Sequence, residues 1–215
     1  DYGSHEIVDL LPEDKKNILV AFYPWRASGN LWTINEKALP VLYRLNVLSG
    51  KKKKLGKLPT PLAKALADSN GDVRFSVSLN DQLNTEVSYR QTASADWERF
   101  SIAGTNGIPI TPISFSADNQ SIFFSAHVNN GTLGVYRLNL RDKTTALVFH
   151  DESVDPSRYI FDLTARNLVG LATEIGQPKY HYLEPSDRKI VLHRTLQKMF
   201  PDHDTVITSS TRDGR

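Results

Sequence analysis

Short apolar runs, separated by clusters of Gly, Asn, Asp and Pro, dominate the pattern along the chain. Apolar and polar positions alternate within many of these runs. In residues 133–140, for example, Tyr136 and Leu138 share one face. Arg137 and Asn139 lie on the other face, and this two-residue period is typical of a half-buried β-strand. The clearest predicted strands are residues 5–11, 17–22, 41–48, 51–55, 62–68, 73–79, 86–91, 96–102, 110–116, 121–128, 133–140 and 144–150.

The predicted strands recur with a period of about 47 residues. Residues 42–46 (LYRLN) return almost unchanged as residues 135–139 (VYRLN). Four tyrosines mark one place in each repeat, at spacings of 46, 47 and 46: Tyr43, Tyr89, Tyr136 and Tyr182. Turn markers upstream have spacings of 48, 47 and 48: Gly71, Asn119, Arg166 and Gly214. Two features with one period indicate a repeat architecture.

Each repeat holds about four strands, and four antiparallel strands per 40–50 residues make one blade of a β-propeller. Only residues 193–200 have a helical pattern, with Leu196, Met199 and Phe200 on one face. We therefore expect an all-β, partial β-propeller of about four blades plus the first strand of a fifth. The expected parts are blades at residues 5–58, 62–102, 110–150 and 158–192, a linker helix at 193–200, and the start of the next blade at 204–215.

We expect the chain to be a segment of a longer protein. It begins with Asp1 rather than methionine, and it stops on a turn at residues 212–214, where another strand should follow. Such a segment would expose an apolar blade face at each end. Self-association through these open faces is one expected consequence, because two copies of about four blades would complete a ring.

The composition narrows the function classes. The chain has 215 residues, of which 40% are hydrophobic and 23% charged, as in ordinary globular domains. The lack of a run of about 18 apolar residues predicts no membrane span. The net charge of +2 is too small to indicate a nucleic-acid partner. Because there are no cysteines, disulfides, thiolate zinc sites and cysteine nucleophiles are excluded.

The sequence contains none of the common catalytic motifs, such as a Gly-x-Ser-x-Gly elbow, a His-Glu-x-x-His helix or a phosphate-binding loop. Six histidines lack metal-ligand spacing. We therefore predict no catalytic residue, no cofactor and no metal, and we expect this chain alone to be inactive. The run of Asp202, His203 and Asp204 has two interpretations: a small metal or acid–base cluster, or a solvated loop that follows the helix.

Two further features are candidates for binding. Lysines at 51–54, with Lys57 nearby, could attract an anion, but they fall where the outermost strand of a blade should lie, and lysines there discourage edge-to-edge pairing. Residues 24–40 read as a loop inserted into the first repeat. Trp25, Arg26 and Trp32 lie in it, and loops on a rigid scaffold often carry binding residues, so we expect contact with a partner or substrate there.

The blade sequence resembles a known family. Residues 113–124 (ISFSADNQSIFF) and 134–140 (GVYRLNL) are similar to the FSxDGxxLxxxS…xxLYxxDL repeat of propellers attached to prolyl oligopeptidase family serine peptidases. The likeness covers essentially the whole chain. Further motifs occur in an order similar to that of bacterial members related to acylaminoacyl and dipeptidyl peptidases: LPED at 11–14, YP at 23–24, LYRLNV at 42–47, YR at 89–90 and WERF at 97–100.

This resemblance implies a role. In that family a propeller covers a separate C-terminal α/β-hydrolase domain bearing Ser, Asp and His, and it admits only short peptides. None of those three residues has a counterpart here. Dipeptidyl members hold the substrate amine with adjacent glutamates, which this sequence lacks, so that specificity does not carry over. The resemblance also favours a periplasmic or secreted location, and a cytoplasmic one stays open.

Two hypotheses result. In the first, the chain is the noncatalytic propeller part of a prolyl oligopeptidase family serine peptidase, where it filters the peptides that reach the hydrolase domain. In the second, it is a stand-alone TolB-like propeller that acts as a protein-binding module. The reading frame downstream of Arg215 distinguishes them: a Gly-x-Ser-x-Gly motif within an α/β pattern favours the peptidase, and a stop codon favours the binding module.

Overall fold

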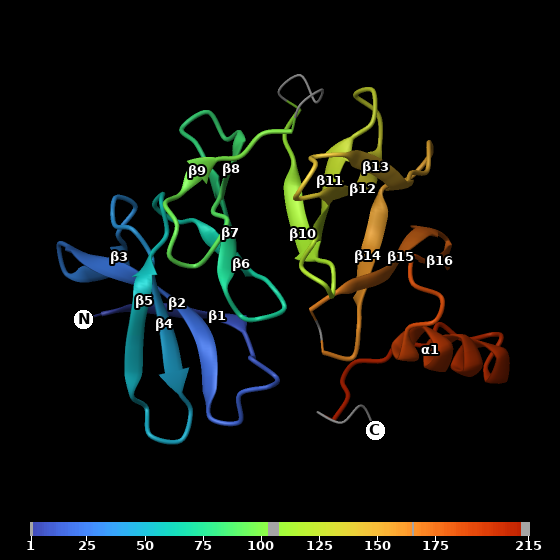
Figure 1. Cartoon of the computed structure of the whole chain (residues 1–215), viewed down its shortest axis with the longest axis horizontal. Coiled ribbons are helices and arrows are strands. Elements are labelled where there is room, and N and C mark those ends of the chain that lie inside the picture. The colour runs from blue at the N-terminus through green and yellow to red at the C-terminus, as the bar shows by residue number, and fades with distance from the viewer. Residues whose placement is uncertain (1, 103–107, 165, 212–215) are drawn as a thin grey trace. The chain divides into compact units, whose positions relative to one another are not determined.

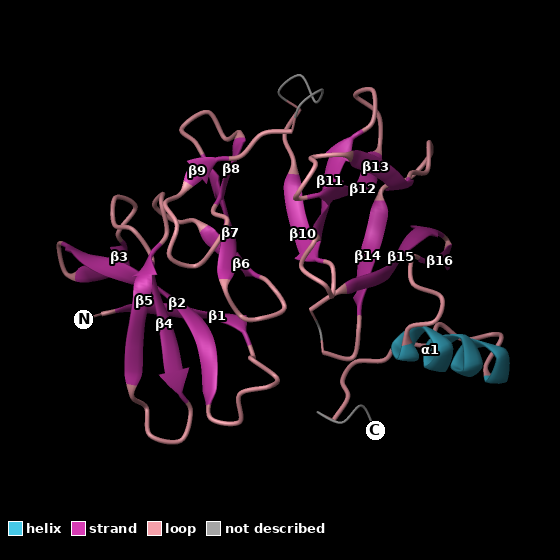
Figure 2. Ribbon diagram, viewed as in Figure 1, coloured by secondary structure: helices cyan, strands magenta, loops and turns pink. Residues whose placement is uncertain are grey.

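The computed structural model describes residues 2–102, 108–164 and 166–211, which contain sixteen strands and one helix (Figure 1). The strands form four sheets, and each sheet is built from strands that follow one another in the sequence (Figure 2). The nearly all-β architecture that the repeat predicts is thus confirmed. The chain divides into two compact units, residues 1–111 and 112–215.

The first sheet has the strand order β1-β2-β4-β5, and β3 pairs with the end of β2. Its strands are β1 (Gly3–Asp9), β2 (Asn17–Ser28), β3 (Leu31–Ile34), β4 (Val41–Asn46) and β5 (Lys52–Lys57). The turn before β2 is closed by Asp14, whose Oδ1 accepts the backbone N–H groups of Lys16 and Asn17 at 3.0 and 3.1 Å. Because β5 is the outermost strand, its lysines lie at a sheet edge, as the sequence predicts.

The expectation of an inserted loop at residues 24–40 is wrong in part, since β2 continues through this region and forms a hairpin with β3. Ser28 pairs with Leu31, so two residues make the reversal. Gly29 adopts a φ of +60° there, a conformation that glycine reaches at little cost. The candidate binding residues therefore lie on paired strands.

The second sheet has the order β6-β7-β8-β9: β6 (Lys64–Ala67), β7 (Val73–Leu79), β8 (Thr85–Tyr89) and β9 (Glu98–Arg99). Its first turn contains Gly71, with a φ of +81° and its N–H donated to the Asp68 carbonyl at 2.9 Å. The core of this unit combines buried residues of both sheets, of the β1–β2 turn and of the segment between the sheets: Leu11, Leu19, Ala21, Leu42, Leu58, Ala63 and Val73. Trp97 packs against this cluster, and the Arg90 guanidinium lies 4.5 Å from its ring centre.

The second unit contains a four-stranded sheet, β10-β11-β12-β13, and a three-stranded sheet, β14-β15-β16. The strands are β10 (Thr111–Phe115), β11 (Ser121–His127), β12 (Leu133–Asn139), β13 (Thr145–Phe149), β14 (Pro156–Phe161), β15 (Leu168–Ile175) and β16 (Gln177–Tyr182). Buried Phe123 and Val135 of one sheet pack with Leu168 and Leu171 of the other. The four repeat tyrosines occupy the third strand along each sheet path, so the repeat corresponds to one sheet: Tyr43 on β4, Tyr89 on β8, Tyr136 on β12 and Tyr182 on β16.

The end of the chain differs from the expectation. The fourth sheet has three strands, because the chain leaves β16 for helix α1 (Arg188–Met199). The helix begins five residues before the predicted start at His193, since Asp187 caps it by accepting the N–H groups of Lys189 and Ile190 at 2.8 and 3.4 Å. Residues 204–211 form no strand, and residues 212–215 lie outside the described part, so the predicted start of a fifth blade is not observed.

The buried face of α1 is also not the predicted one. Ile190 and His193 are buried, and Ile190 packs with Ile160 and Val169 of the three-stranded sheet β14-β15-β16. Met199 is 65% exposed and Phe200 47% exposed, so the apolar spacing near the helix end is not a core face. No helix within the described ranges has the length and apolar character needed to cross a bilayer.

Candidate functional site

An aromatic pocket of about 450 Å³ lies on the first sheet, beside the β2–β3 hairpin. Volumes of about 300–1,000 Å³ are usual for ligand pockets in proteins. The pocket is formed by the start of the chain, the middle of β2, the hairpin and β4. Its lining residues are mostly aromatic: Tyr2, Phe22, Pro24, Trp25, Trp32, Val41 and Tyr43.

The hairpin register places the two tryptophans on one face of the hairpin, and both line this pocket. Trp25 lies opposite Ile34, and Trp32 lies opposite Ala27 two pairs further along the ladder. The Trp32 ring packs against the Tyr2 ring, with centroids 4.5 Å apart and planes at 37°. Trp25 is 38% exposed and Trp32 50% exposed, so both rings remain available to a ligand. Large, partly exposed aromatic rings of this kind are common anchors for protein and peptide partners.

The pocket has a cationic border. The Lys52 Nζ atom lies 5.6 Å from the Phe22 ring centre and 5.2 Å from the Tyr43 ring centre, within the range of a cation–π contact. His5 also packs against Phe22, with ring centroids 4.9 Å apart. Burial lowers the pKa of His5, and the Lys52 charge lowers it further, so the imidazole is neutral at pH 7. The fixed charge beside the rings is therefore the lysine.

The structure brings together two of the three residues singled out from the sequence. Trp25 and Trp32 line the same pocket, whereas Arg26 lies exposed on the hairpin, opposite Thr33, and is not one of the lining residues. Sequence reasoning missed Tyr2 and Tyr43. Tyr43 belongs to the periodic tyrosine series, which is a signal of blade packing rather than of a binding site.

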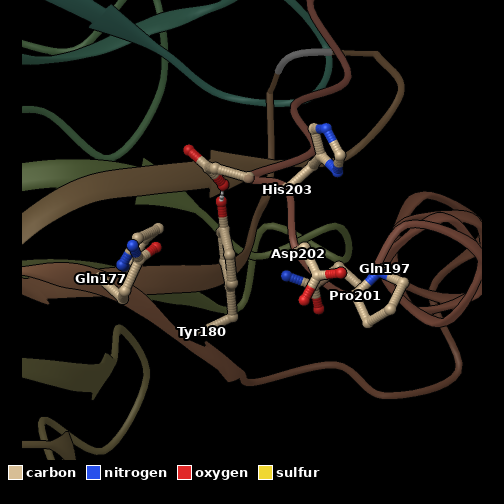
Figure 3. A pocket seen from close by; sticks show the side chains of 8 residues that line it. Gln177, Tyr180, Gln197, Pro201, Asp202 and His203 are labelled. Atoms are coloured by element: carbon tan, nitrogen blue, oxygen red, sulfur yellow. Dashed lines mark hydrogen bonds between the residues drawn. The ribbon is translucent and has the colours of Figure 1, made fainter.

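A second pocket, of about 560 Å³, lies in the other unit beside α1 (Figure 3). It is more polar than the first, and the run from Pro201 to Asp204 forms one of its walls. Its lining residues are Gln177, Pro178, Tyr180, Gln197, Pro201, Asp202, His203 and Asp204.

Two polar side chains of this second pocket, Tyr180 and Asp204, are hydrogen-bonded to each other. The Tyr180 hydroxyl donates to Asp204 Oδ1, and the Arg158 Nη2 atom lies 3.4 Å from Asp204 Oδ2. Arg158 Nη1 also donates to the Tyr180 oxygen at 3.1 Å. Burial and then the Asp204 carboxylate raise the pKa of Tyr180 to about 12, so its hydroxyl stays protonated at neutral pH. These contacts fasten the segment after α1 to strands β14 and β16.

His193 contributes to the same fastening. Its Nε2 atom lies 2.6 Å from the Thr205 carbonyl oxygen, and its Nδ1 atom lies 2.9 Å from the Tyr182 hydroxyl. Both ring nitrogens are thus engaged within the fold, and the side chain is buried. Asp202 and His203, by contrast, are exposed, as expected for a solvated loop after a helix. No group of three or more His, Asp or Glu side chains in the described residues could hold a metal ion.

No protein-family model and no curated protein matches the chain. Among solved structures, the crystal structure of TolB from Acinetobacter baumannii matches 83% of this chain, with a TM-score of 0.50 and 14% sequence identity. The match covers 40% of the TolB chain, so this chain spans less than half of that structure. A likeness at this identity establishes the fold alone. Together with the four sheets and their repeat, it shows that the chain has the fold of a partial β-propeller.

Proposed function

We propose that this chain is a noncatalytic propeller module that binds peptide segments at the aromatic pocket of its first sheet. The observation that carries the proposal is the convergence of Trp25, Trp32 and Tyr2 on one pocket. These rings offer a large contact area at a small cost in side-chain entropy, and the two tryptophans stand on paired strands that hold them in place. The absence of common catalytic motifs from the sequence supports a binding role rather than turnover.

We further propose that this module is part of a longer protein, a prolyl oligopeptidase family serine peptidase. The resemblance of the blade motif at residues 113–124 and 134–140 to the repeat of that family supports this choice. In such a parent, the partner would be a C-terminal α/β-hydrolase domain, and the propeller would filter peptides on their way to it. A periplasmic or secreted location is part of the same proposal.

The second candidate is a stand-alone TolB-like propeller that binds a protein. The structural likeness to TolB favours it, although that likeness concerns the fold. The two candidates share peptide or protein binding and differ in the downstream sequence. A reading frame that continues past Arg215 into an α/β pattern with a Gly-x-Ser-x-Gly motif supports the peptidase. A stop codon there supports the stand-alone module.

The binding proposal is tested by replacing both tryptophans. We expect the double variant Trp25→Ala, Trp32→Ala to bind short fluorescein-labelled, phenylalanine-containing peptides at least about 10-fold more weakly than the unmodified chain, because truncation of central aromatic anchors costs about 2 kcal/mol or more. Fluorescence anisotropy measures the affinity, and far-UV circular dichroism checks the fold.

Leu83→Ala is the matched control, because Leu83 is 78% exposed in another turn of the same unit. It should leave the affinity unchanged. The proposal is contradicted if the unmodified chain binds none of the peptides, or if the double variant and the control bind them equally well.

A further inference from the structure

The lysines of the edge strand β5 are unequally distributed between the two faces of the first sheet. Strand pairing places Lys57 opposite Val41, Lys54 opposite Tyr43, and Lys52 opposite Leu45. Cross-strand partners project from the same face of a sheet. Val41 and Tyr43 line the aromatic pocket, so these three lysines stand on the pocket face of the sheet.

Of the remaining lysines of the run, Lys51 precedes β5, and Lys53 does not share this face. Lys53 pairs with Arg44, whose neighbours on β4 are the pocket residue Tyr43 on one side and Leu45 on the other. Because side chains alternate along a strand, Lys53 projects from the opposite face. Protection of an open edge requires charge on the edge strand but does not distinguish the two faces. Edge protection therefore does not explain why three of these lysines lie on the face that carries the pocket.

The acidic side chain Glu6 of β1 lies on the opposite face of the sheet. On β1, Glu6 pairs with Ala21, a residue of the buried cluster, and Glu6 Oε2 accepts a hydrogen bond from the Tyr23 hydroxyl at 3.0 Å. On the pocket face, by contrast, β1 presents His5 opposite Phe22. The strand positions that share the pocket face thus combine aromatic and aliphatic residues with lysines: Gly3, His5, Ile7, Ile18, Val20, Phe22, Pro24, Val41, Tyr43, Leu45, Lys52, Lys54 and Lys57.

We infer that the pocket is selective for acidic peptide segments that carry an aromatic side chain. The aromatic side chain of the peptide packs among the pocket rings, in the offset or edge-to-face geometries that such rings prefer. The acidic residues beside it lie along β5, where the lysine ammonium groups complement them and increase the rate of encounter. This inference rests on the proposed function and specifies the class of peptide.

The experiment compares three synthetic peptides that hold one phenylalanine between acidic, neutral or basic residues. Fluorescence anisotropy gives the affinity of each for the unmodified chain. We expect the acidic peptide to bind roughly 3- to 10-fold more tightly than the neutral one, because a few exposed ion pairs each contribute a modest factor. We expect the basic peptide to bind least well. The preference should shrink as salt is added, because these charges are exposed to solvent.

Two variants with the same change in net charge separate the faces. Lys52→Glu with Lys54→Glu alters the pocket face, and it should abolish or reverse the preference for the acidic peptide. Lys51→Glu with Lys53→Glu is the matched control, and it should retain most of the preference. All four side chains are exposed, so both variants are expected to fold, and circular dichroism verifies this.

The outcomes distinguish the two proposals. If none of the peptides binds, the proposed function itself fails. If the acidic and neutral peptides bind equally well, or if the control variant loses as much preference as the pocket-face variant, peptide binding stands and the inference of acidic selectivity is overturned. Sedimentation velocity tests whether a second copy of the chain, instead of a peptide, occupies the pocket. A dimer that the acidic peptide does not dissociate would also overturn the inference.

Discussion

At the scale of single residues, the turns that precede the second strand of each sheet share one pattern of side-chain to backbone hydrogen bonds. A side-chain oxygen near the start of the turn accepts backbone N–H groups of the turn. Asp68 Oδ1 accepts from Asn70 and Asp72, at 2.9 and 3.1 Å. Asp162 Oδ1 accepts from Thr164 and Arg166, at 3.0 and 3.1 Å. Aspartate suits this position because its short side chain reaches the backbone two residues ahead.

The β10–β11 turn gives a pH-dependent prediction. The Ser116 hydroxyl donates to Asp118 Oδ1 at 2.6 Å and the Gln120 N–H donates to it at 3.0 Å, and these bonds lower the pKa of Asp118. A lowered folded-state pKa adds stability above the ordinary aspartate pKa of 3.8, and that stability is lost as the pH falls through the folded-state value.

Asp118→Asn should therefore reduce the fall in unfolding free energy between about pH 5 and about pH 2. The effect is small, on the order of 0.5–1 kcal/mol, because the carboxylate is close to solvent. Urea denaturation monitored by tryptophan fluorescence at several pH values measures it. Identical pH profiles for the variant and the unmodified chain would contradict the role assigned to Asp118.

The candidate site was only partly predictable from individual residues. Trp25 and Trp32 stand out in the sequence because they fall outside the repeat. Tyr43 does not, because it occupies the same repeat position as Tyr89 and Tyr136, which pack against the Phe75 and Phe124 rings of their own sheets. Whether such a tyrosine is a core residue or a pocket residue depends on what covers its face, and that information is not local.

At the scale of elements, strand positions followed from the alternating pattern, whereas helix α1 was misplaced. The prediction relied on apolar spacing at Leu196, Met199 and Phe200, but the face that is buried carries Ile190 and His193. The buried face could not be recognised from the sequence because it contains a histidine. The burial of His193 depends on partners on β16 and in the segment after the helix. The cap at Asp187 was the better local signal for where the helix begins.

That cap gives a second stability prediction. Asp187→Ala should lower the unfolding free energy by about 1 kcal/mol, because Lys189 and Ile190 lose the acceptor of their backbone N–H groups. Asp187→Asn is the matched control, since asparagine is also a good N-cap and should lose little. Chemical denaturation followed by circular dichroism measures both. An equal loss in the two variants would indicate that charge, rather than capping, is the contribution of Asp187.

At the scale of the whole molecule, the repeat predicted the class of fold well. The period of about 47 residues identified four sheets, and the structural likeness to TolB agrees with the propeller interpretation. The strand count of the last sheet was not predictable in the same way, because the sequence after β16 departs from the repeat. The peptidase assignment goes further than the fold and remains a proposal.

The proposal that this chain binds peptides without hydrolysing them gives a prediction for the whole chain. We expect the purified 215-residue protein to hydrolyse chromogenic aminoacyl and dipeptidyl substrates no faster than buffer, because the sequence has no strained nucleophile turn of the serine hydrolase type. A spectrophotometric assay with an active serine peptidase as positive control measures this. Hydrolysis that copurifies with the chain and is abolished by a serine-directed inhibitor would overturn the noncatalytic assignment.

The sequential order of strands within each sheet has a consequence for how the chain acquires its structure. Neighbouring strands are joined by short connections, so most pairing partners are near one another in the sequence. Little entropy is lost in bringing them together, and each sheet is able to nucleate without waiting for distant segments. Like other repeat proteins, this one should therefore tolerate several alternative orders of assembly, with no single sheet obliged to form first.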